Sequence, residues 1–269
     1  MADSKIYFDK KNNRLVYIKK ESSPKFWDNK WRTSDDQLKK VIMNGRKNFF
    51  MRQLTRKYVK QGGKILEGGC GTGQHVYAFN NWGYDSYGID FAKSTIKAVN
   101  RVFPSLKIIE GDVNSLPYSS GFFDACWSLG VIEHFYGGYE QIVREMERVV
   151  KTDGYIFVSF PVMSGLRKLK ASHKYYPELS KDVNLKNFYQ FALNENQVIN
   201  DFRIIGLKLV GKRYLSGLKG LKDEVAFMRF SLQKLYDSKN IFFRVCKKTL
   251  SICLARMSPH MVLLIFKKL

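Results

Sequence analysis

The nine residues from Ile65 to Gly73, I-L-E-G-G-C-G-T-G, decide how this chain folds. A short apolar run ends in Glu67, and a glycine follows at every second position from Gly69 onward, before an amphipathic segment begins at Gln74. Glycine is required where the backbone takes a positive φ or where a Cβ would strike a ligand. The stretch therefore predicts a strand, a tight glycine turn and a helix start, an arrangement in which backbone N–H groups approach a nucleotide-like ligand.

The spacing of these glycines separates two classes of nucleotide site. A dinucleotide fingerprint, G-x-G-x-x-G, counted from Gly69 or from Gly71, needs its last glycine where this chain has Gln74 or Val76. Neither register fits. The segment matches E-x-G-x-G-x-G instead, beginning at Glu67. A nicotinamide-dependent oxidoreductase is therefore disfavoured.

The segments that follow continue the strand–helix alternation of a doubly wound sheet. Asp90 ends the second strand, 23 residues after Glu67, and an acid at that tip can accept hydrogen bonds from two ribose hydroxyls. The turn at Asp153-Gly154 is expected to lead into the fifth strand, which Pro161 stops. The predicted strands after the glycine turn are residues 84–89, 106–110, 122–128 and 155–160. We therefore predict an α/β fold with a Rossmann-like, doubly wound sheet.

The motif and the order of these elements resemble the class I S-adenosylmethionine (SAM) dependent methyltransferases. The phrases G-D-V-N-S-L-P at 111–117 and M-E-R-V-V-K-T-D-G at 146–154 resemble the type 11 subgroup, typified by the ubiquinone and menaquinone C-methyltransferases. The resemblance implies a seven-stranded sheet with an antiparallel edge hairpin, SAM as methyl donor and S-adenosyl-L-homocysteine as product. Two departures are Gly68, where the family often has a larger apolar residue, and Thr152-Asp153-Gly154, which replaces a Pro-Gly-Gly turn.

The resemblance also implies which residues hold the cofactor. In the family an acid after the third strand bonds the exocyclic amine of adenine, and Asp112 occupies that place. The segment from Leu129 to His134 resembles the one that lines the methionine end of the donor and opens towards the acceptor. The implied cofactor-binding residues are Glu67, Gly69, Cys70, Gly71, Gly73, Asp90, Phe91, Asp112, Val113 and Leu129.

One residue of that segment is also the candidate catalytic group. Methyl transfer from a sulfonium is an in-line displacement, so orientation and proximity supply most of the catalysis. A general base is needed only where the acceptor is a hydroxyl or a carbon acid, and His134 is the best-placed base, with a structural role as its alternative. Glu133 and Tyr136 are candidates to line the acceptor pocket, and His75 is expected to be an ordinary surface or packing residue. No metal site is predicted, because the four cysteines have no C-x-x-C spacing.

The net charge of +22 is distributed unevenly along the chain. Residues 1–60 carry +11, residues 61–160 carry −3 and residues 161–269 carry +14. A basic surface of this strength attracts the phosphates of an anionic membrane or of nucleic acid, while a solvated lysine-rich surface is an equal alternative. An RNA methyltransferase is not favoured, because the fourth strand is not followed by an Asn/Asp-Pro-Pro-Tyr/Phe motif.

The chain is expected to divide into an N-terminal basic cap segment, residues 1–60, and a methyltransferase domain, residues 61–269. Within the cap segment a helix is predicted at 35–60. The aromatic cluster at 26–31 is expected to pack against the sheet rather than contact the substrate.

After the fifth strand, a lid or insertion is predicted at about 164–189. A helix capped by Asn194 follows, and strands at 204–214 and 261–266 form the edge hairpin. Between these strands a helical insertion at about 216–259 mixes apolar with basic side chains, among them Lys239, Phe242, Arg244 and Val245. It fits a substrate cover, the favoured interpretation, or a helix lying in a membrane interface.

The favoured function is a SAM-dependent methyltransferase that acts on a small-molecule, lipid-linked or saccharide acceptor. The alternatives are an RNA methyltransferase and a catalytically silent SAM-binding or membrane-associated module. The sequence contains no cleavable apolar leader and no run of ~18 uncharged apolar residues. A cytoplasmic location is therefore expected, with the basic flanks allowing peripheral contact with the inner face of a membrane. No oligomeric state is predicted.

Overall fold

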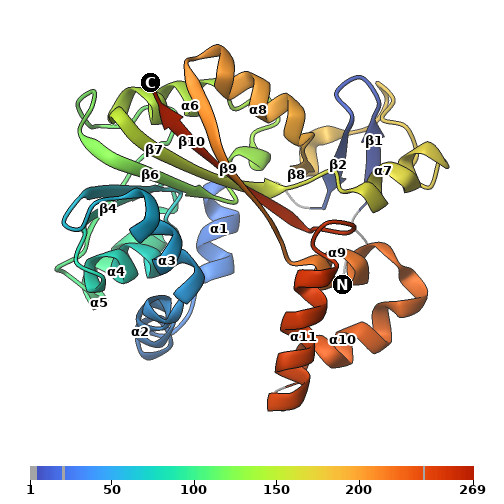
Figure 1. Cartoon of the computed structure of the whole chain (residues 1–269), viewed down its shortest axis with the longest axis horizontal. Coiled ribbons are helices and arrows are strands. Elements are labelled where there is room, and N and C mark those ends of the chain that lie inside the picture. The colour runs from blue at the N-terminus through green and yellow to red at the C-terminus, as the bar shows by residue number, and fades with distance from the viewer. Residues whose placement is uncertain (1–4, 20–21, 239) are drawn as a thin grey trace.

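A seven-stranded sheet carries the fold, in the strand order β5-β4-β3-β6-β7-β10-β9 (Figure 1). Strands β5 to β7 of this order are parallel, and β10 runs antiparallel to both of its neighbours. The predicted doubly wound sheet with an antiparallel edge hairpin is confirmed. The strands are β3 (Lys64–Gly68), β4 (Asp85–Asp90), β5 (Lys107–Glu110), β6 (Phe123–Leu129), β7 (Val150–Pro161), β9 (Leu207–Leu215) and β10 (Met261–Lys268).

The computed structural model describes residues 5–19, 22–238 and 240–269. Within these ranges the side chains of Tyr236, Ile241, Phe242, Arg244 and Val245 are not described. The predicted contributions of Lys239, Phe242, Arg244 and Val245 to the basic insertion therefore lie outside the described parts.

Helices cover both faces of the sheet because apolar side chains alternate along its strands. Leu66 of β3 belongs to a buried cluster shared with α6 (Glu140–Val149) and α8 (Glu195–Ile204). The adjacent Ile65 belongs to a cluster with α3 (Phe49–Tyr58) and α4 (Gln74–Asn81) on the other face. This second helical layer is extended by α2 (Asp35–Asn44) and α5 (Lys93–Val102), as Figure 1 shows. Asn194 caps α8 as predicted.

The N-terminal region forms a β-hairpin that the sequence did not predict. Strands β1 (Lys5–Asp9) and β2 (Arg14–Ile18) pair antiparallel, and β2 pairs in turn with β8 (Phe188–Ala192). This second sheet joins the start of the chain to the segment predicted as a lid. The helix that follows β2 in the sequence is α1 (Pro24–Trp31). Ser23 caps its start, since its side chain accepts a hydrogen bond from the backbone N–H of Phe26.

The helix predicted at 35–60 is two helices, α2 and α3, separated by the 3₁₀ turn η1 (Gly45–Lys47). A Cβ on Gly45 would lie 2.0 Å from the backbone oxygen of Gln74, so the chain crosses the start of α4 at a distance that only glycine allows. Asn48 then begins α3, because its side chain accepts a hydrogen bond from the backbone N–H of Met51 at 3.1 Å. The crossing, rather than local propensity, breaks the helix.

The fifth strand of the parallel set also differs from its prediction. Strand β7 begins at Val150 instead of Tyr155, and Asp153-Gly154 lies inside it rather than forming a turn. The register against β6 shifts between Phe123 and Ala125, and Asp153 has a φ of 64°. A β-bulge and a turn use the same residue types, so the two could not be separated from the sequence.

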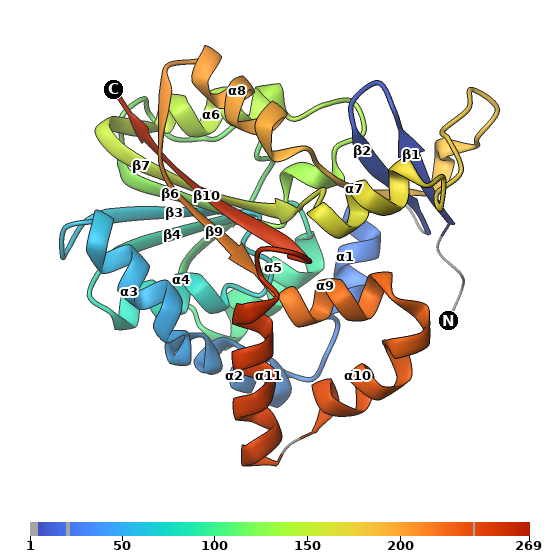
Figure 2. The same cartoon turned by 45° about the vertical axis from the view of Figure 1, so that its right-hand side comes forward.

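The insertion before β10 is helical, as predicted. It contains α9 (Gly217–Glu224), η4 (Ala226–Met228), α10 (Arg229–Asp237) and α11 (Ile241–Cys253). These helices project from the end of the sheet where β9 and β10 meet them, close to α7 (Gly165–Ser172) (Figure 2). Among the described residues, no helix has the length and apolar character needed to span a bilayer.

Candidate functional site

The glycine turn after β3 adopts backbone conformations that other residues rarely take. Gly69, Gly71 and Gly73 have φ values of 75°, 51° and 71°. A Cβ on Gly73 would lie 2.4 Å from Ile108, so this glycine allows α4 to approach the sheet closely. A Cβ on Gly71 would lie 2.9 Å from the ring of Trp31, a residue of α1. The turn is therefore covered by α1.

Asp90, at the tip of β4, is held by the backbone of the same turn. Its Oδ2 accepts a hydrogen bond from the N–H of Gly71 at 2.8 Å, and its Oδ1 accepts one from the N–H of Ala92 at 2.9 Å. Burial raises the pKa of Asp90, the two backbone donors oppose that effect, and the carboxylates of Glu67 and Asp28 add to it. Each carboxylate oxygen keeps a lone pair, so Asp90 can still accept hydrogen bonds from a ligand.

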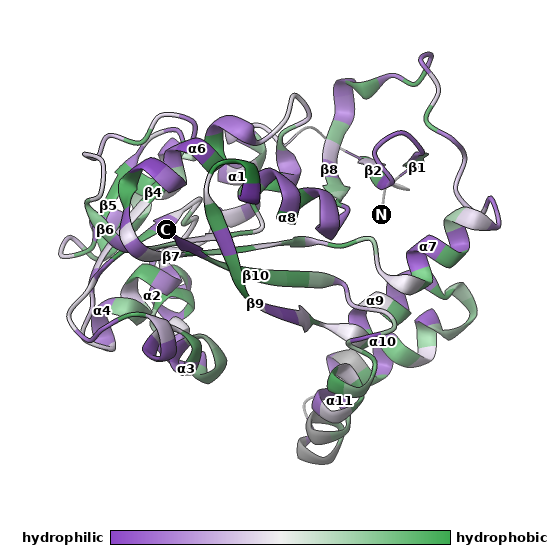
Figure 3. Cartoon of the chain, turned by 45° about the horizontal axis from the view of Figure 1, so that its top comes forward, coloured by the Kyte–Doolittle hydropathy of each residue, from purple (hydrophilic) through white to green (hydrophobic). Residues whose placement is uncertain are grey.

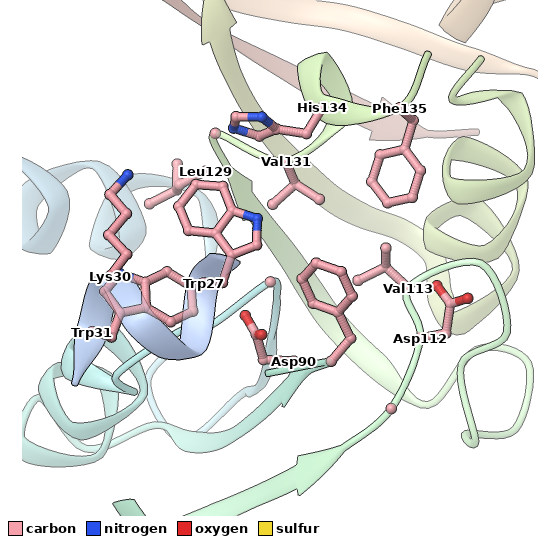
Figure 4. Close-up of a pocket in the computed structure, with 14 residues that line it drawn as sticks. Trp27, Lys30, Trp31, Asp90, Asp112, Val113, Leu129, Val131, His134 and Phe135 are labelled. Atoms are coloured by element: carbon pink, nitrogen blue, oxygen red, sulfur yellow. The ribbon is translucent and has the colours of Figure 1, made fainter. Parts of the chain in front are cut away.

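A cavity of about 310 Å³ lies at the carboxyl ends of the parallel strands, between the glycine turn and α1 (Figure 4). This is where open α/β sheets bind their ligands. It is lined by Trp27, Lys30, Trp31, Gly69, Asp90, Phe91, Gly111, Asp112, Val113, Leu129, Gly130, Val131, His134 and Phe135. The structure thus brings together seven of the predicted site residues, from Gly69 to His134.

The other four predicted residues lie behind the cavity wall. Gly71 and Gly73 shape the turn, as described above. Cys70 is buried, and its Sγ lies 2.8 Å from where a Cβ on Gly88 would be, so its side chain packs beneath the turn. Glu67 is 2% exposed, and its Oε1 lies 2.6 Å from Nδ1 of His75.

The pair formed by Glu67 and His75 was not predicted. Burial lowers the pKa of His75, but the Glu67 carboxylate and its hydrogen bond outweigh this, so the pKa is raised overall. Among the described residues no group hydrogen-bonds Oε2 of Glu67. The sequence contained a signal for this pair. Glu67 lies near the end of β3 and His75 in the first turn of the next helix, α4, so the chain brings the two side chains together.

Helix α1 forms the roof of the cavity. The rings of Trp27 and Trp31, one helical turn apart, lie 5.0 Å from each other, and Nζ of Lys30 lies 4.2 Å from the ring centre of Trp27. The expectation that this aromatic cluster packs against the sheet is wrong, because both tryptophans line the cavity. Asp28 fixes the roof in place by accepting hydrogen bonds from the N–H and Oγ1 of Thr95 at the start of α5.

His134 lies beside the roof, in the turn η2 (Ile132–His134) after β6, and its ring centre is 5.0 Å from that of Trp27 (Figure 4). Its Nδ1 lies 2.6 Å from the carbonyl oxygen of Tyr189, which can only accept, so Nδ1 carries the proton. Burial lowers the pKa of His134 to about 4, the Tyr189 carbonyl opposes this, and Lys30 lowers it further. The imidazole is therefore neutral near pH 7, with its lone pair on Nε2.

A second cavity, of about 590 Å³, shares Phe91, His134 and Phe135 with the first. Tyr136 lines this second cavity, whereas Glu133 lines neither cavity and is buried beneath the turn. The second cavity is lined by Ser22, Ser23, Pro24, Phe91, His134, Phe135, Tyr136, Gly137, Gly138, Leu185, Lys186 and Phe188. His134 thus stands where the two cavities meet.

The insertion predicted as a substrate cover lies apart from both cavities, since no described residue of 216–259 lines either one. The first cavity is covered instead by α1, from the N-terminal segment. Trp27, Lys30 and Trp31 are the site residues that sequence reasoning missed, and their spacing along one helical face was the available signal.

Residues 66–158 match the family model described as a methyltransferase domain. This part of the chain is similar to the class I SAM-dependent methyltransferases. SAM is the cofactor that this family uses. The matched range runs from β3 into β7, and so holds the glycine turn, Asp90 and His134.

Among curated relatives, this chain is 28% identical over 176 residues to a demethylmenaquinone methyltransferase of Lysinibacillus sphaericus, covering 60% of this chain and 74% of that one. It is 22% identical over 132 residues to a malonyl-[acyl-carrier protein] O-methyltransferase of Erwinia pyrifoliae, covering 49% of each. The chain thus spans about half the length of the Erwinia relative.

A solved structure shares the fold. Geranyl diphosphate C-methyltransferase from Streptomyces coelicolor, in complex with Mg²⁺, geranyl diphosphate and S-adenosyl-L-homocysteine, aligns with a TM-score of 0.50 at 14% identity. The alignment covers 82% of this chain and 77% of that one.

Proposed function

We propose that this chain transfers a methyl group from SAM to a small-molecule acceptor. The observation that carries the proposal is a single arrangement: Asp90 and the glycine turn bound one end of a roofed cavity, and the neutral His134 bounds the other. The matched family supports the donor, and the second cavity supports a separate entrance for the acceptor.

The residues of the first cavity fit SAM. Its volume of about 310 Å³ falls in the range of small-molecule sites. We propose that Asp90 accepts hydrogen bonds from the ribose hydroxyls and that Asp112, whose Oδ1 is bonded by Asn114, offers its Oδ2 to the adenine amine. The remaining proposed cofactor-binding residues are Glu67, Gly69, Cys70, Gly71, Gly73, Phe91, Val113 and Leu129.

The aromatic roof supports the same assignment. When bound, SAM supplies an electrophilic methyl group on a sulfonium, which is transferred by in-line displacement. Trp27 and Trp31 line the cavity with aromatic surface, and aromatic faces attract cations. Holding the acceptor against the methyl group supplies most of the rate enhancement.

His134 is the proposed catalytic residue. The Tyr189 carbonyl fixes its tautomer and leaves the Nε2 lone pair available at the junction of the two cavities. An acceptor hydroxyl or acidic C–H entering from the second cavity can donate to Nε2, which orients it and removes its proton. The low pKa keeps the imidazole in the accepting form throughout the neutral range.

The acceptor that fits the second cavity has an apolar body. Phe91, Phe135, Tyr136 and Phe188 supply aromatic surface, and Lys186 places a cation at the wall. The two curated relatives are named for a quinone precursor and for an acyl-carrier-protein thioester, and both names favour a lipid-linked or acyl acceptor over a saccharide.

We also propose a cytoplasmic protein that works at the inner face of an anionic membrane. The support is the charge, +11 in residues 1–60 and +14 in residues 161–269, outside the near-neutral core. An apolar, lipid-linked acceptor would be found at such a surface.

Isothermal titration calorimetry with SAM, S-adenosyl-L-homocysteine and NAD tests the donor. Binding of the first two alone is expected, and absence of SAM binding would overturn the proposal. Transfer of a tritiated methyl group into fractions of a cell extract then tests the acceptor class. Label in the organic-extractable fraction supports an apolar acceptor, and label in RNA supports the RNA methyltransferase instead. SAM binding with no labelled product from any fraction favours the catalytically silent module.

A further inference from the structure

A third hollow, of about 570 Å³, lies between the end of β9, α9, α11 and the start of α3. We call it the basic groove. It shares no residue with the two cavities of the candidate site. Its lining residues are Phe50, Arg213, Tyr214, Leu215, Ser216, Leu218, Lys219, Lys247, Lys248, Ser251, Ile252 and Ala255.

The base of the basic groove is tightly packed, so its shape is preformed. A Cβ on Gly217 would lie 2.5 Å from the backbone N of Ala255, and a Cβ on Gly220 would lie 1.9 Å from the backbone O of Ser258. The fully buried hydroxyl of Ser258 donates to the carbonyl of Gly217 at 3.1 Å. Helix α9 therefore meets the end of α11 at a distance that only glycine permits.

A buried charge cluster fixes the other side of α9. Glu224, at its last turn, is bonded by Nε of Arg167 at 2.9 Å, by Nζ of Lys170 at 2.9 Å and by the hydroxyl of Tyr176. Arg167 and Lys170 belong to α7, so these bonds join the insertion to the body of the molecule.

The rim of the basic groove carries four cationic side chains, Arg213, Lys219, Lys247 and Lys248, and no carboxylate is among its lining residues. Two acids outside the lining contact it: Asp223 lies 2.6 Å from Nζ of Lys219, and Glu195 accepts a hydrogen bond from the hydroxyl of Tyr214 at 2.7 Å. Lys248 is exposed, and its position on α11, one turn before Ile252, points it into the groove. The groove is therefore positive and attracts an anion.

Apolar side chains continue outward from the groove onto the surface. Ile252 is 66% exposed and Phe50 is 43% exposed although both line it, and Phe49 beside it is 67% exposed. On the neighbouring η4 and α10, Phe227 and Phe230 are exposed as well. Figure 3 shows apolar segments among polar ones along α9 and α10. Aromatic and aliphatic tips beside cations are typical of a surface that enters a lipid headgroup layer.

We infer that the basic groove seats the headgroup of an anionic phospholipid, with Phe50 and Ile252 contacting its acyl chains. The inference specifies the surface for the membrane association proposed above, and is independent of methyl transfer. A lipid fits better than nucleic acid, because an RNA backbone would use the cations and leave the aliphatic Ile252 without a partner. The shared ligand chemistry is a phosphate ester.

Vesicle flotation tests the inference with phosphatidylcholine vesicles, alone or mixed with phosphatidylglycerol. The wild-type chain is expected to float only with the mixed vesicles. The charge variant Arg213→Glu/Lys248→Glu should bind at least tenfold more weakly, since each cation near an anionic surface contributes about fivefold. The apolar variant Phe50→Ser/Ile252→Ser should also bind several-fold more weakly.

The matched control is Lys97→Glu/Lys208→Glu, which makes the same change in net charge at exposed positions on α5 and β9, outside the groove lining. It is expected to bind vesicles within about twofold of wild type, because screening limits distant charges. Each variant should keep its SAM affinity, which shows that it is folded and separates this test from that of methyl transfer.

Three results would overturn the inference. If the control loses as much binding as the charge variant, net charge rather than the groove binds the membrane. If the charge variant loses binding of inorganic phosphate while the apolar variant binds vesicles as wild type does, the groove takes a free phosphate. If a single-stranded RNA oligonucleotide binds, and the charge variant loses it while the apolar variant does not, the partner is nucleic acid.

Discussion

Glu133, beneath the candidate site, and Glu224, at the junction of α7 and α9, are both buried, yet their surroundings shift their pKa values in opposite directions. Burial raises the pKa of Glu133 to about 8, opposed only by its own backbone N–H. Burial also acts on Glu224, but Arg167, Tyr176 and Lys170 outweigh it and lower the pKa. One carboxyl is therefore neutral near pH 7 and the other is charged.

The difference extends beyond these two residues. Four of the buried polar atoms that have no hydrogen-bond partner among the described residues belong to Glu67, Trp127, Ser128 and Glu133. All of them lie on β3, on β6 or in the turn after β6. Unsatisfied buried groups cost free energy and concentrate where function requires them. The two regions thus serve different purposes: the junction is built for stability and the cavity region for binding.

The largest expected effect is in the junction. Glu224→Gln leaves Arg167 buried without its carboxylate, and breaking a buried pair in this way costs about 3–5 kcal/mol of the free energy of unfolding. Chemical denaturation at pH 7 measures it. The control, Glu178→Gln, removes an exposed carboxylate 3.8 Å from Lys10 and should change stability by less than ~1 kcal/mol. Equal losses of stability in the two variants would mean that the charge of Glu224 does not balance that of Arg167 as described.

The lowered pKa of Glu224 also sets a direction with pH. Its ionised form is favoured by folding, so its contribution is complete above the unfolded pKa near 4.5 and is lost as the pH falls through the lower folded value. The difference between wild type and Glu224→Gln should therefore shrink under acidic conditions.

The next effect is catalytic and confined to the cavity. His134→Gln should keep the hydrogen bond to Tyr189 but cannot accept a proton, so kcat is expected to fall by at least ~10²-fold, about 2.7 kcal/mol. Initial rates with an acceptor from the extract fractions measure it. His173→Gln, at the exposed C-terminal cap of α7, should retain the wild-type rate. An unchanged rate in His134→Gln would assign this histidine a purely structural role.

A smaller loss is expected for cofactor binding. Asp90→Ala removes the proposed ribose acceptor and leaves the N–H groups of Gly71 and Ala92 without their partner, so SAM should bind more than ~10-fold more weakly, about 1.4 kcal/mol. Calorimetry measures the affinity. Asp35→Ala, an exposed carboxylate paired with Arg101, is the control. If Asp90→Ala binds SAM as wild type does, the ribose assignment is wrong.

The smallest expected effect is that of replacing Glu133, and it is a gain in stability rather than a loss. Below the unfolded pKa near 4.5, Glu133 is neutral in both states and contributes no pH dependence. Between there and its folded pKa of about 8, only the unfolded chain is ionised, so stability falls as the pH rises.

Glu133→Gln is always neutral and escapes this loss. It should be more stable than wild type by at least ~1 kcal/mol at pH 8.5, about 2–4 °C in Tm, and nearly equal to it at pH 4. Thermal denaturation at both values measures the crossover. A destabilised variant at pH 8.5 would mean that the Glu133 carboxylate has a partner and is charged.

The comparison also explains what could be predicted from the sequence. The glycine turn, Asp90 and the strands around them depend on contacts between neighbours in sequence, and the structure places them as predicted. The α1 roof, the break at Gly45 and the pairing of β2 with β8 depend on contacts between distant segments, which a single sequence does not display. The position of Trp31 above Gly71 belongs to this second class.

The pairing of β2 with β8 has a consequence for how the protein is made. Strand β8 begins 170 residues after β2 ends, so a ribosome needs roughly 10 to 30 seconds between the two. Until then the hairpin lacks its partner, and α1 lacks the ring of Tyr189, which lies 5.8 Å from that of Phe26. The hydrogen bond between Nδ1 of His134 and the Tyr189 carbonyl can likewise form only after β8 has emerged. The strand that orients His134 is thus made later than the glycine turn and α1, between which the cavity lies.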